Sequence, residues 1–79
     1  MRVTYDPQVD AAYIYLREID SGGVKHTVPL DDLESNVESV GRLVLDFDEE
    51  GRLVGIEALD ACEVLPPELL RDAEPPGGG

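Results

Sequence analysis

Residues 41–57 read GRLVLDFDEEGRLVGIE, and this segment decides the fold class. Two β-prone runs, 43–47 and 53–59, flank an acidic turn that ends on Gly51. A type I turn followed by a left-handed residue is a common hairpin connection, and glycine adopts that conformation at the lowest cost. The segment therefore predicts an antiparallel β-hairpin in the middle of the chain.

Alternating polar and apolar residues extend this pattern toward the N-terminus and indicate further half-buried strands. Asp6 and Pro7 favour a turn between the first two strands, because aspartate caps a turn with its own side chain and proline presets φ. Pro29 donates no ladder hydrogen bond, so the third strand lies at an edge or ends there. The five expected strands are 2–5, 11–17, 24–29, 42–48 and 52–59.

The C-terminal part of the chain departs from this β pattern. Proline and an acid in the first turn predict a short helix over 66–72, and the segment 73–79, rich in proline and glycine, is expected to be disordered. Residues 31–40 suit either a helix or a polar loop. We expect one mainly β (α+β) domain over 1–65, an antiparallel meander of about five short strands, followed by that helix.

The charge of the chain limits its partners. There are 18 acidic and 6 basic residues, giving a formal net charge of -12. Nucleic acids and anionic membranes bind cationic groups, so this charge disfavours both. A basic protein or a cation is favoured, although acidity also serves solubility alone.

Length and cysteine content bear on location and assembly. A chain of 79 residues supports a marginal core, and its single cysteine, Cys62, favours a reducing compartment. No leader sequence opens the chain, and no apolar run approaches the roughly 20 residues that span a bilayer. We therefore expect a soluble cytoplasmic protein.

Both arms of the central hairpin carry apolar side chains on both faces. Such strands are covered on both sides in folded proteins, and a chain this short offers only one short helix as cover. The second layer is then expected to come from another protomer, in a homodimer.

The residues give little support for an enzyme. The one histidine, His26, and Cys62 lie in no nucleophile motif. Glu57, Asp60 and Glu63 resemble paired carboxylates for acid–base chemistry, but the sequence indicates no pocket around them. No cofactor is predicted.

A metal site is the sharper alternative. Oxygen ligands at Asp46, Asp48, Glu50 and Glu57 nearly match the spacing of an EF-hand calcium loop. That loop lies between two helices, whereas both flanks here are predicted strands. Solvated turn acids are therefore the simpler interpretation, and no cysteine and histidine spacing suits zinc.

Tyr13, Tyr15 and Arg17 share one face of the second predicted strand. Tyrosine and arginine are enriched at protein-binding hot spots, so this face is a candidate binding surface. The alternative is that the C-terminal helix covers it through Leu65, Leu69 and Leu70.

Two motifs in the chain resemble a known family. They are Tyr5-Asp6-Pro7-x-x-Asp10-x-x-Tyr13-Ile14-x-Leu16 and Leu45-Asp46-Phe47-Asp48-x-x-Gly51-x-Leu53-Val54-Gly55-Ile56-Glu57-x-Leu59-Asp60-Ala61. In this order they resemble the small prokaryotic proteins grouped as domain of unknown function family 2283. The resemblance implies a small β-rich domain and supplies no catalytic residues. Its members are associated with neighbouring ribonuclease-like toxins, which implies an antitoxin role as one version of the function.

Taken together, these features predict an acidic, non-enzymatic interaction protein that binds a basic protein partner. The competing hypotheses are a small-molecule or metal-dependent enzyme or binding protein that uses the acidic hairpin, and a purely structural homodimeric module.

Overall fold

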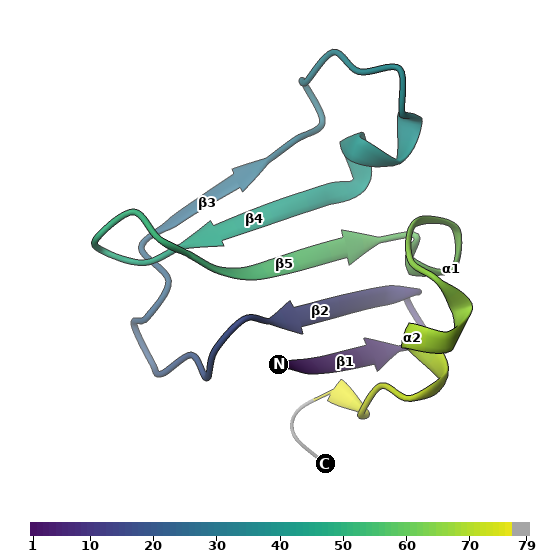
Figure 1. The fold of residues 1–79 in the computed structure, drawn as a ribbon, viewed down its shortest axis with the longest axis horizontal. Helices are drawn as coiled ribbons and strands as arrows, with labels where there is room; N and C mark the ends of the chain where they lie inside the picture. The colour runs from purple at the N-terminus through teal and green to yellow at the C-terminus, as the bar shows by residue number, and fades with distance from the viewer. Residues whose placement is uncertain (77–79) are drawn as a thin grey trace.

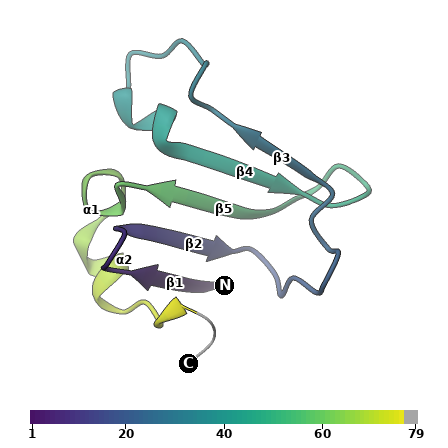
Figure 2. The same ribbon diagram turned by 180° about the vertical axis from the view of Figure 1, so that it is seen from behind.

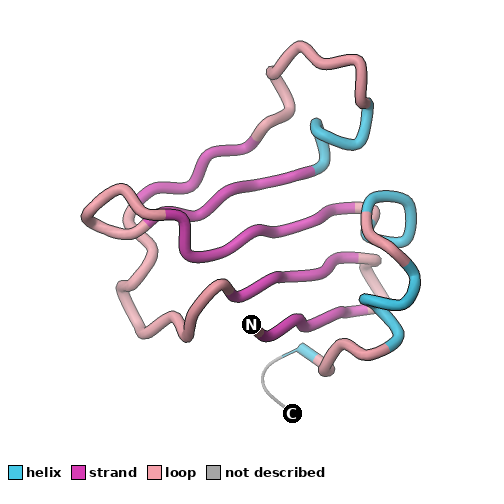
Figure 3. The backbone as a smooth tube through the Cα atoms, viewed as in Figure 1, coloured by secondary structure: helices cyan, strands magenta, loops and turns pink. Residues whose placement is uncertain are grey.

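A computed structural model of the chain describes residues 1–76, and it contains one five-stranded antiparallel sheet (Figures 1 and 3). The predicted fold class is confirmed. The strands are β1 (Arg2–Asp6), β2 (Ala11–Tyr15), β3 (His26–Pro29), β4 (Leu43–Phe47) and β5 (Leu53–Leu59). A 3-10 helix, η1 (Glu38–Arg42), precedes β4, and two short helices follow the sheet: α1 (Ala61–Val64) and α2 (Pro67–Arg71).

The strand order is β1-β2-β5-β4-β3, which differs from a simple meander. In a meander β2 would pair with β3, whereas here β2 pairs with β5 and β3 forms the opposite edge. The ten residues between β2 and β3 make this possible, because they are long enough to cross the roughly 5 Å that each intervening strand adds. The arrangement places β5, which carries buried Val54 and Ala58, at the centre.

Several boundaries follow the sequence closely. Asp6 accepts a hydrogen bond from the backbone amide of Gln8 (3.0 Å), as expected of a capped turn, and β3 is an edge strand that ends at Pro29. The segment 31–37 is a loop that leads into η1, so it contains no α-helix. Helix α1 was not predicted, because four residues are too few to show a helical period.

The register aligns side chains in rows, since directly opposed residues of antiparallel strands share a face. One face carries an aliphatic row across all five strands: Val3, Ile14, Ile56, Leu45 and Val28. Beside it on the same face runs a second row: Tyr5, Ala12, Ala58 and Leu43. The opposite face carries a polar row: Arg2, Tyr15, Gly55, Asp46 and Thr27.

The helices cover only one end of one face. Ala12, Ala58 and Ala61 form the buried cluster, against which Val64, Leu65 and Leu70 pack from the helical segment. Figures 1 and 2 show α1 and α2 beside the ends of β5, β2 and β1, away from the rest of the sheet. No helix within residues 1–76 is long and apolar enough to cross a membrane.

The outer edge of β1 is closed by the chain itself. The amide of Tyr5 donates to the carbonyl of Glu74 (2.8 Å), and the amide of Glu74 donates to the carbonyl of Val3 (2.9 Å). Glu74 belongs to the tail expected to be disordered over 73–79. Within that tail, the stretch 77–79 lies outside the described residues.

Asp48 holds the turn between β4 and β5. Only 3% of its surface is exposed. One carboxylate oxygen accepts hydrogen bonds from the backbone amides of Arg52 (2.9 Å) and Glu50 (3.0 Å). The other accepts from Arg17 (3.1 Å). The pKa of Asp48 is held below its usual value, chiefly by the hydrogen bond from the Arg52 amide. The Glu50 amide and the charge of Arg17 act in the same direction, and desolvation opposes them.

We predict that Asp48→Asn lowers the melting temperature at pH 7 and flattens its decline in acid. A depressed folded-state pKa stabilises the fold above the unfolded value of about 3.9, and this stability is lost as the pH falls through the folded value. Thermal melts between pH 2 and 7 test this, with Glu49→Gln as a control that removes one exposed charge from the same turn. Identical acid profiles for the two variants would contradict the role given to Asp48.

Candidate interaction surface

Tyr13 crosses the polar face of the sheet. Its hydroxyl donates a hydrogen bond to Asp46 Oδ2 (2.5 Å), and the Thr27 hydroxyl donates to Asp46 Oδ1 (2.7 Å). Gly55 of β5 lies between β2, which carries Tyr13, and β4, which carries Asp46. A β-carbon at Gly55 would overlap the ring and hydroxyl of Tyr13. The missing side chain of Gly55 therefore lets a side chain of β2 reach across β5 to β4.

This position also favours the protonated form of Tyr13. Burial, together with the hydrogen bond and negative charge of Asp46, raises the pKa of Tyr13 above its usual value. The shift reinforces the role of the phenol as the donor of this bond.

Tyr15 lies beside Tyr13, and the guanidinium of Arg2 stacks on its ring. The two ring centroids are 4.7 Å apart with planes inclined by 53°. The Arg2 guanidinium carbon lies 4.0 Å from the centre of the Tyr15 ring, and Glu18 accepts a hydrogen bond from Arg2 Nε (3.2 Å). The aromatic pair thus forms a surface that accepts a guanidinium, an interaction favoured by the negative charge of the ring face.

Arg17 lies just beyond β2 and turns toward the hairpin of β4 and β5. Its side chain is 58% exposed while it pairs with Asp48. The sequence predicted that Arg17 lies on one strand face with Tyr13 and Tyr15. In the structure the two tyrosines lie side by side, whereas Arg17 pairs with Asp48 of the β4–β5 turn. The helices pack on the opposite face, so they do not cover this one.

The four acids of the calcium-like spacing occupy different environments. Asp46 accepts hydrogen bonds from two hydroxyl groups, and Glu57 lies in β5 opposite Tyr13. Asp48 accepts hydrogen bonds from the backbone of its own turn, in which Glu50 is exposed. Within residues 1–76, no three or more histidine, cysteine, aspartate or glutamate side chains are grouped so that they could hold a metal ion. The hairpin geometry spreads these acids apart.

The paired-carboxylate candidates and His26 occupy three different places in the fold. Asp60 accepts a hydrogen bond from Arg42 (2.7 Å), and Glu63 lies 4.0 Å from the same guanidinium, so two of the three paired-carboxylate candidates share one arginine. Their predicted companion Glu57 lies within β5. His26 is exposed at the edge strand β3.

One side-chain network was missed in the sequence. The Tyr5 hydroxyl donates to Asp10 Oδ1 (2.8 Å), the same oxygen accepts the backbone amide of Cys62 (3.1 Å), and the Cys62 sulfur lies 3.2 Å from the hydroxyl. The bonds with Cys62 and Asp10 raise the pKa of Tyr5, while those from Tyr5 and Cys62 lower the pKa of Asp10. This network fastens α1 to the first hairpin, and the pairing of Tyr5 with Asp10 in the first motif was its available signal.

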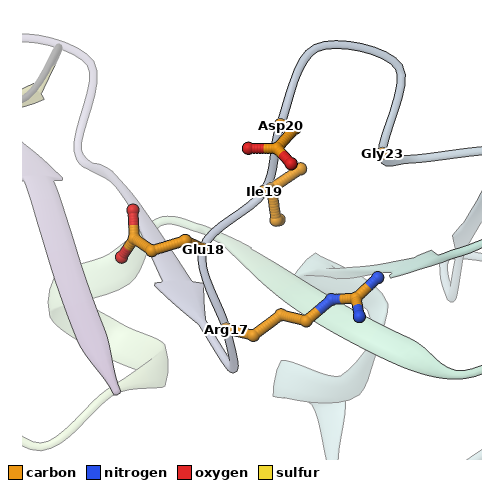
Figure 4. A pocket seen from close by; sticks show the side chains of 5 residues that line it. All are labelled: Arg17, Glu18, Ile19, Asp20 and Gly23. Carbon is orange, nitrogen blue, oxygen red and sulfur yellow. The ribbon is translucent and has the colours of Figure 1, made fainter.

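Two surface hollows lie near these residues, one beside Arg17 and one beside Tyr5 and Cys62. One of about 180 Å³ is lined by the loop that follows β2. Figure 4 shows its Arg17 and Glu18 side chains pointing in different directions. Another, of about 330 Å³, lies between Tyr5, Cys62 and α2, and its lining is mostly apolar.

The fold and this surface define a class of protein: a small domain with a single antiparallel sheet, whose polar face carries a pair of tyrosines that no helix covers. Residues 2–61 match the family described as "Protein of unknown function (DUF2283)", and the chain belongs to that family. No curated protein and no solved structure matches the chain.

We predict that Gly55→Ala destabilises the protein by about 1–3 kcal/mol, because the new methyl group displaces Tyr13 from Asp46. The same substitution in a Tyr13→Ala background should be neutral or stabilising, since glycine is unfavourable inside a strand. Chemical denaturation of the wild type, the two single variants and the double variant gives the free energies of unfolding, and from them the interaction energy between positions 13 and 55. Equal costs of Gly55→Ala in both backgrounds would contradict the contact.

Proposed function

We propose that this protein is a non-enzymatic binding module that recognises a basic protein partner through the polar face of its sheet. The protein acts as a homodimer in the cytoplasm of a prokaryotic cell. Antitoxin-like neutralisation of a small basic protein is the most concrete version of this function.

The observation that carries the proposal is the uncovered tyrosine pair. Both helices pack on the other face, which leaves the half-buried Tyr13 and Tyr15 on a face of the sheet that no helix covers. Aromatic side chains held on a sheet lose little entropy on binding and supply much contact area. Arg2 stacked on Tyr15 illustrates the chemistry that such a ring accepts from a partner.

Charge supports a basic partner. The net charge of -12 accelerates encounter with a cationic protein. On the polar face, Glu57 lies next to Tyr13 across the strand pair, while Arg2 and Arg17 already pair with acids of the same chain. An acidic surface of this kind also substitutes for phosphate at the nucleic-acid site of a basic enzyme.

We predict that Glu57→Lys weakens capture of basic proteins from native lysate about tenfold, because it reverses the charge beside the tyrosines. The control is Glu68→Lys, which makes the same change in net charge on exposed α2. Captured proteins are identified by mass spectrometry and their isoelectric points are compared. Capture should also decline as salt is added.

Two results would overturn the proposed function. One is capture of acidic or neutral proteins only. The other is equal capture by the Glu57→Lys and Glu68→Lys variants, which would show that net charge acts without the polar face.

A further inference from the structure

The aliphatic row lies on the face of the sheet opposite the tyrosines and is only partly buried. Val3, Ile14, Ile56 and Leu45 are half-buried, and Val28 is 43% exposed. The row runs without a polar interruption across all five strands. The helices cover the neighbouring row of Tyr5, Ala12, Ala58 and Leu43 instead.

The consequence is a small core. Among the described residues, the buried apolar side chains are Ala12, Val54, Ala58 and Ala61, three of which are alanines. Most of the larger apolar side chains therefore retain contact with water in a single copy. Contiguous apolar surface of this kind marks an interaction site in soluble proteins.

The total surface is large for the mass. A folded monomer of 8.6 kDa exposes about 4,700 Å² by the usual scaling with mass, whereas this chain exposes 5388 Å². The excess is about 700 Å², close to the roughly 800 Å² that each partner buries in a standard protein interface.

The sheet edges offer a poorer route to association. Glu74 already occupies the backbone groups of Val3 and Tyr5 at the outer edge of β1. The other edge strand, β3, contains Pro29 and follows Lys25, and both residue types oppose strand pairing between molecules.

Charge fixes the orientation of two copies. Each carries a net charge of -12, so they repel unless their acidic surfaces are kept apart. The aliphatic row contains no charged residue, while Asp46 and Glu57 lie on the opposite face. Contact between two aliphatic rows therefore places these acids on the outside.

We infer that a second copy of this chain covers the aliphatic row, so that two sheets pack face to face with their tyrosine pairs pointing outward. This inference extends the proposed function by naming the surface of the homodimer and giving it two equivalent partner sites. Added salt strengthens this contact because it screens the repulsion between copies, whereas it weakens binding of a basic partner.

Two neighbours on β3 provide a matched test. Val28 belongs to the aliphatic row and Thr27 to the polar row, and both are exposed. Val28→Lys and Thr27→Lys change the net charge equally. Sedimentation equilibrium of the full chain at micromolar concentration should give a dimer for the wild type and for Thr27→Lys, and at least a tenfold weaker dimer for Val28→Lys.

A second variant and a fold control complete the experiment. Leu16, 41% exposed, continues the alternation of Ile14 beyond β2, and Leu16→Lys should weaken the dimer in the same way. Circular dichroism and thermal melts establish that the lysine variants remain folded. The wild-type dimer should tighten between 50 mM and 500 mM sodium chloride.

The outcomes separate the inference from the proposed function. A wild-type monomer at 100 µM would overturn the homodimer, and a dimer that Val28→Lys and Thr27→Lys affect equally would overturn this surface. Capture of basic proteins by a monomeric Val28→Lys protein would leave the polar face as the partner site. Loss of capture in Glu57→Lys with an intact dimer would support both assignments.

Discussion

The pairing of β5 with β2 on one side and β4 on the other is the constraint on which the remaining structure depends. It joins the two hairpins into one sheet and fixes which side chains share a face. Because side chains alternate along a strand, a shift by one residue would move Ile56 to the polar face and Glu57 to the aliphatic face. The hydrophobic pattern and Gly55 both oppose such a shift: the first keeps Ile56 in the aliphatic row, and the second leaves room for Tyr13.

Local features of the sequence predicted most of the fold. The acidic turn ending at Gly51, the Asp6 cap and the strand-limiting Pro29 are short-range signals, and each lies where its chemistry requires. The strand order was not predictable in the same way, since alternation identifies strands without saying which neighbour each one pairs with. Helix α1 was too short to leave a pattern.

The candidate surface was predicted in part for the same reason. Tyr13 and Tyr15 share a face because they are two residues apart on one strand. The bond from Tyr13 to Asp46 joins residues 33 positions apart, and the contact of Tyr5 with Cys62 spans 57 positions, so neither follows from local spacing. The acids of the hairpin show the converse: their spacing suggested a calcium loop, and strand geometry distributes them between a turn and a sheet face.

The strand order also has a consequence for how the chain folds. The pairs β1–β2, β3–β4 and β4–β5 each form between neighbours in the sequence. The first and third of these close short loops at low entropic cost, while the β3–β4 connection over 30–42 is longer. The β2–β5 pair joins segments about forty residues apart, so it closes the longest loop of the sheet at the highest entropic cost. The hydrogen bond of Tyr13 to Asp46 reports that this long-range pairing is in place, because that bond has no counterpart in either hairpin alone.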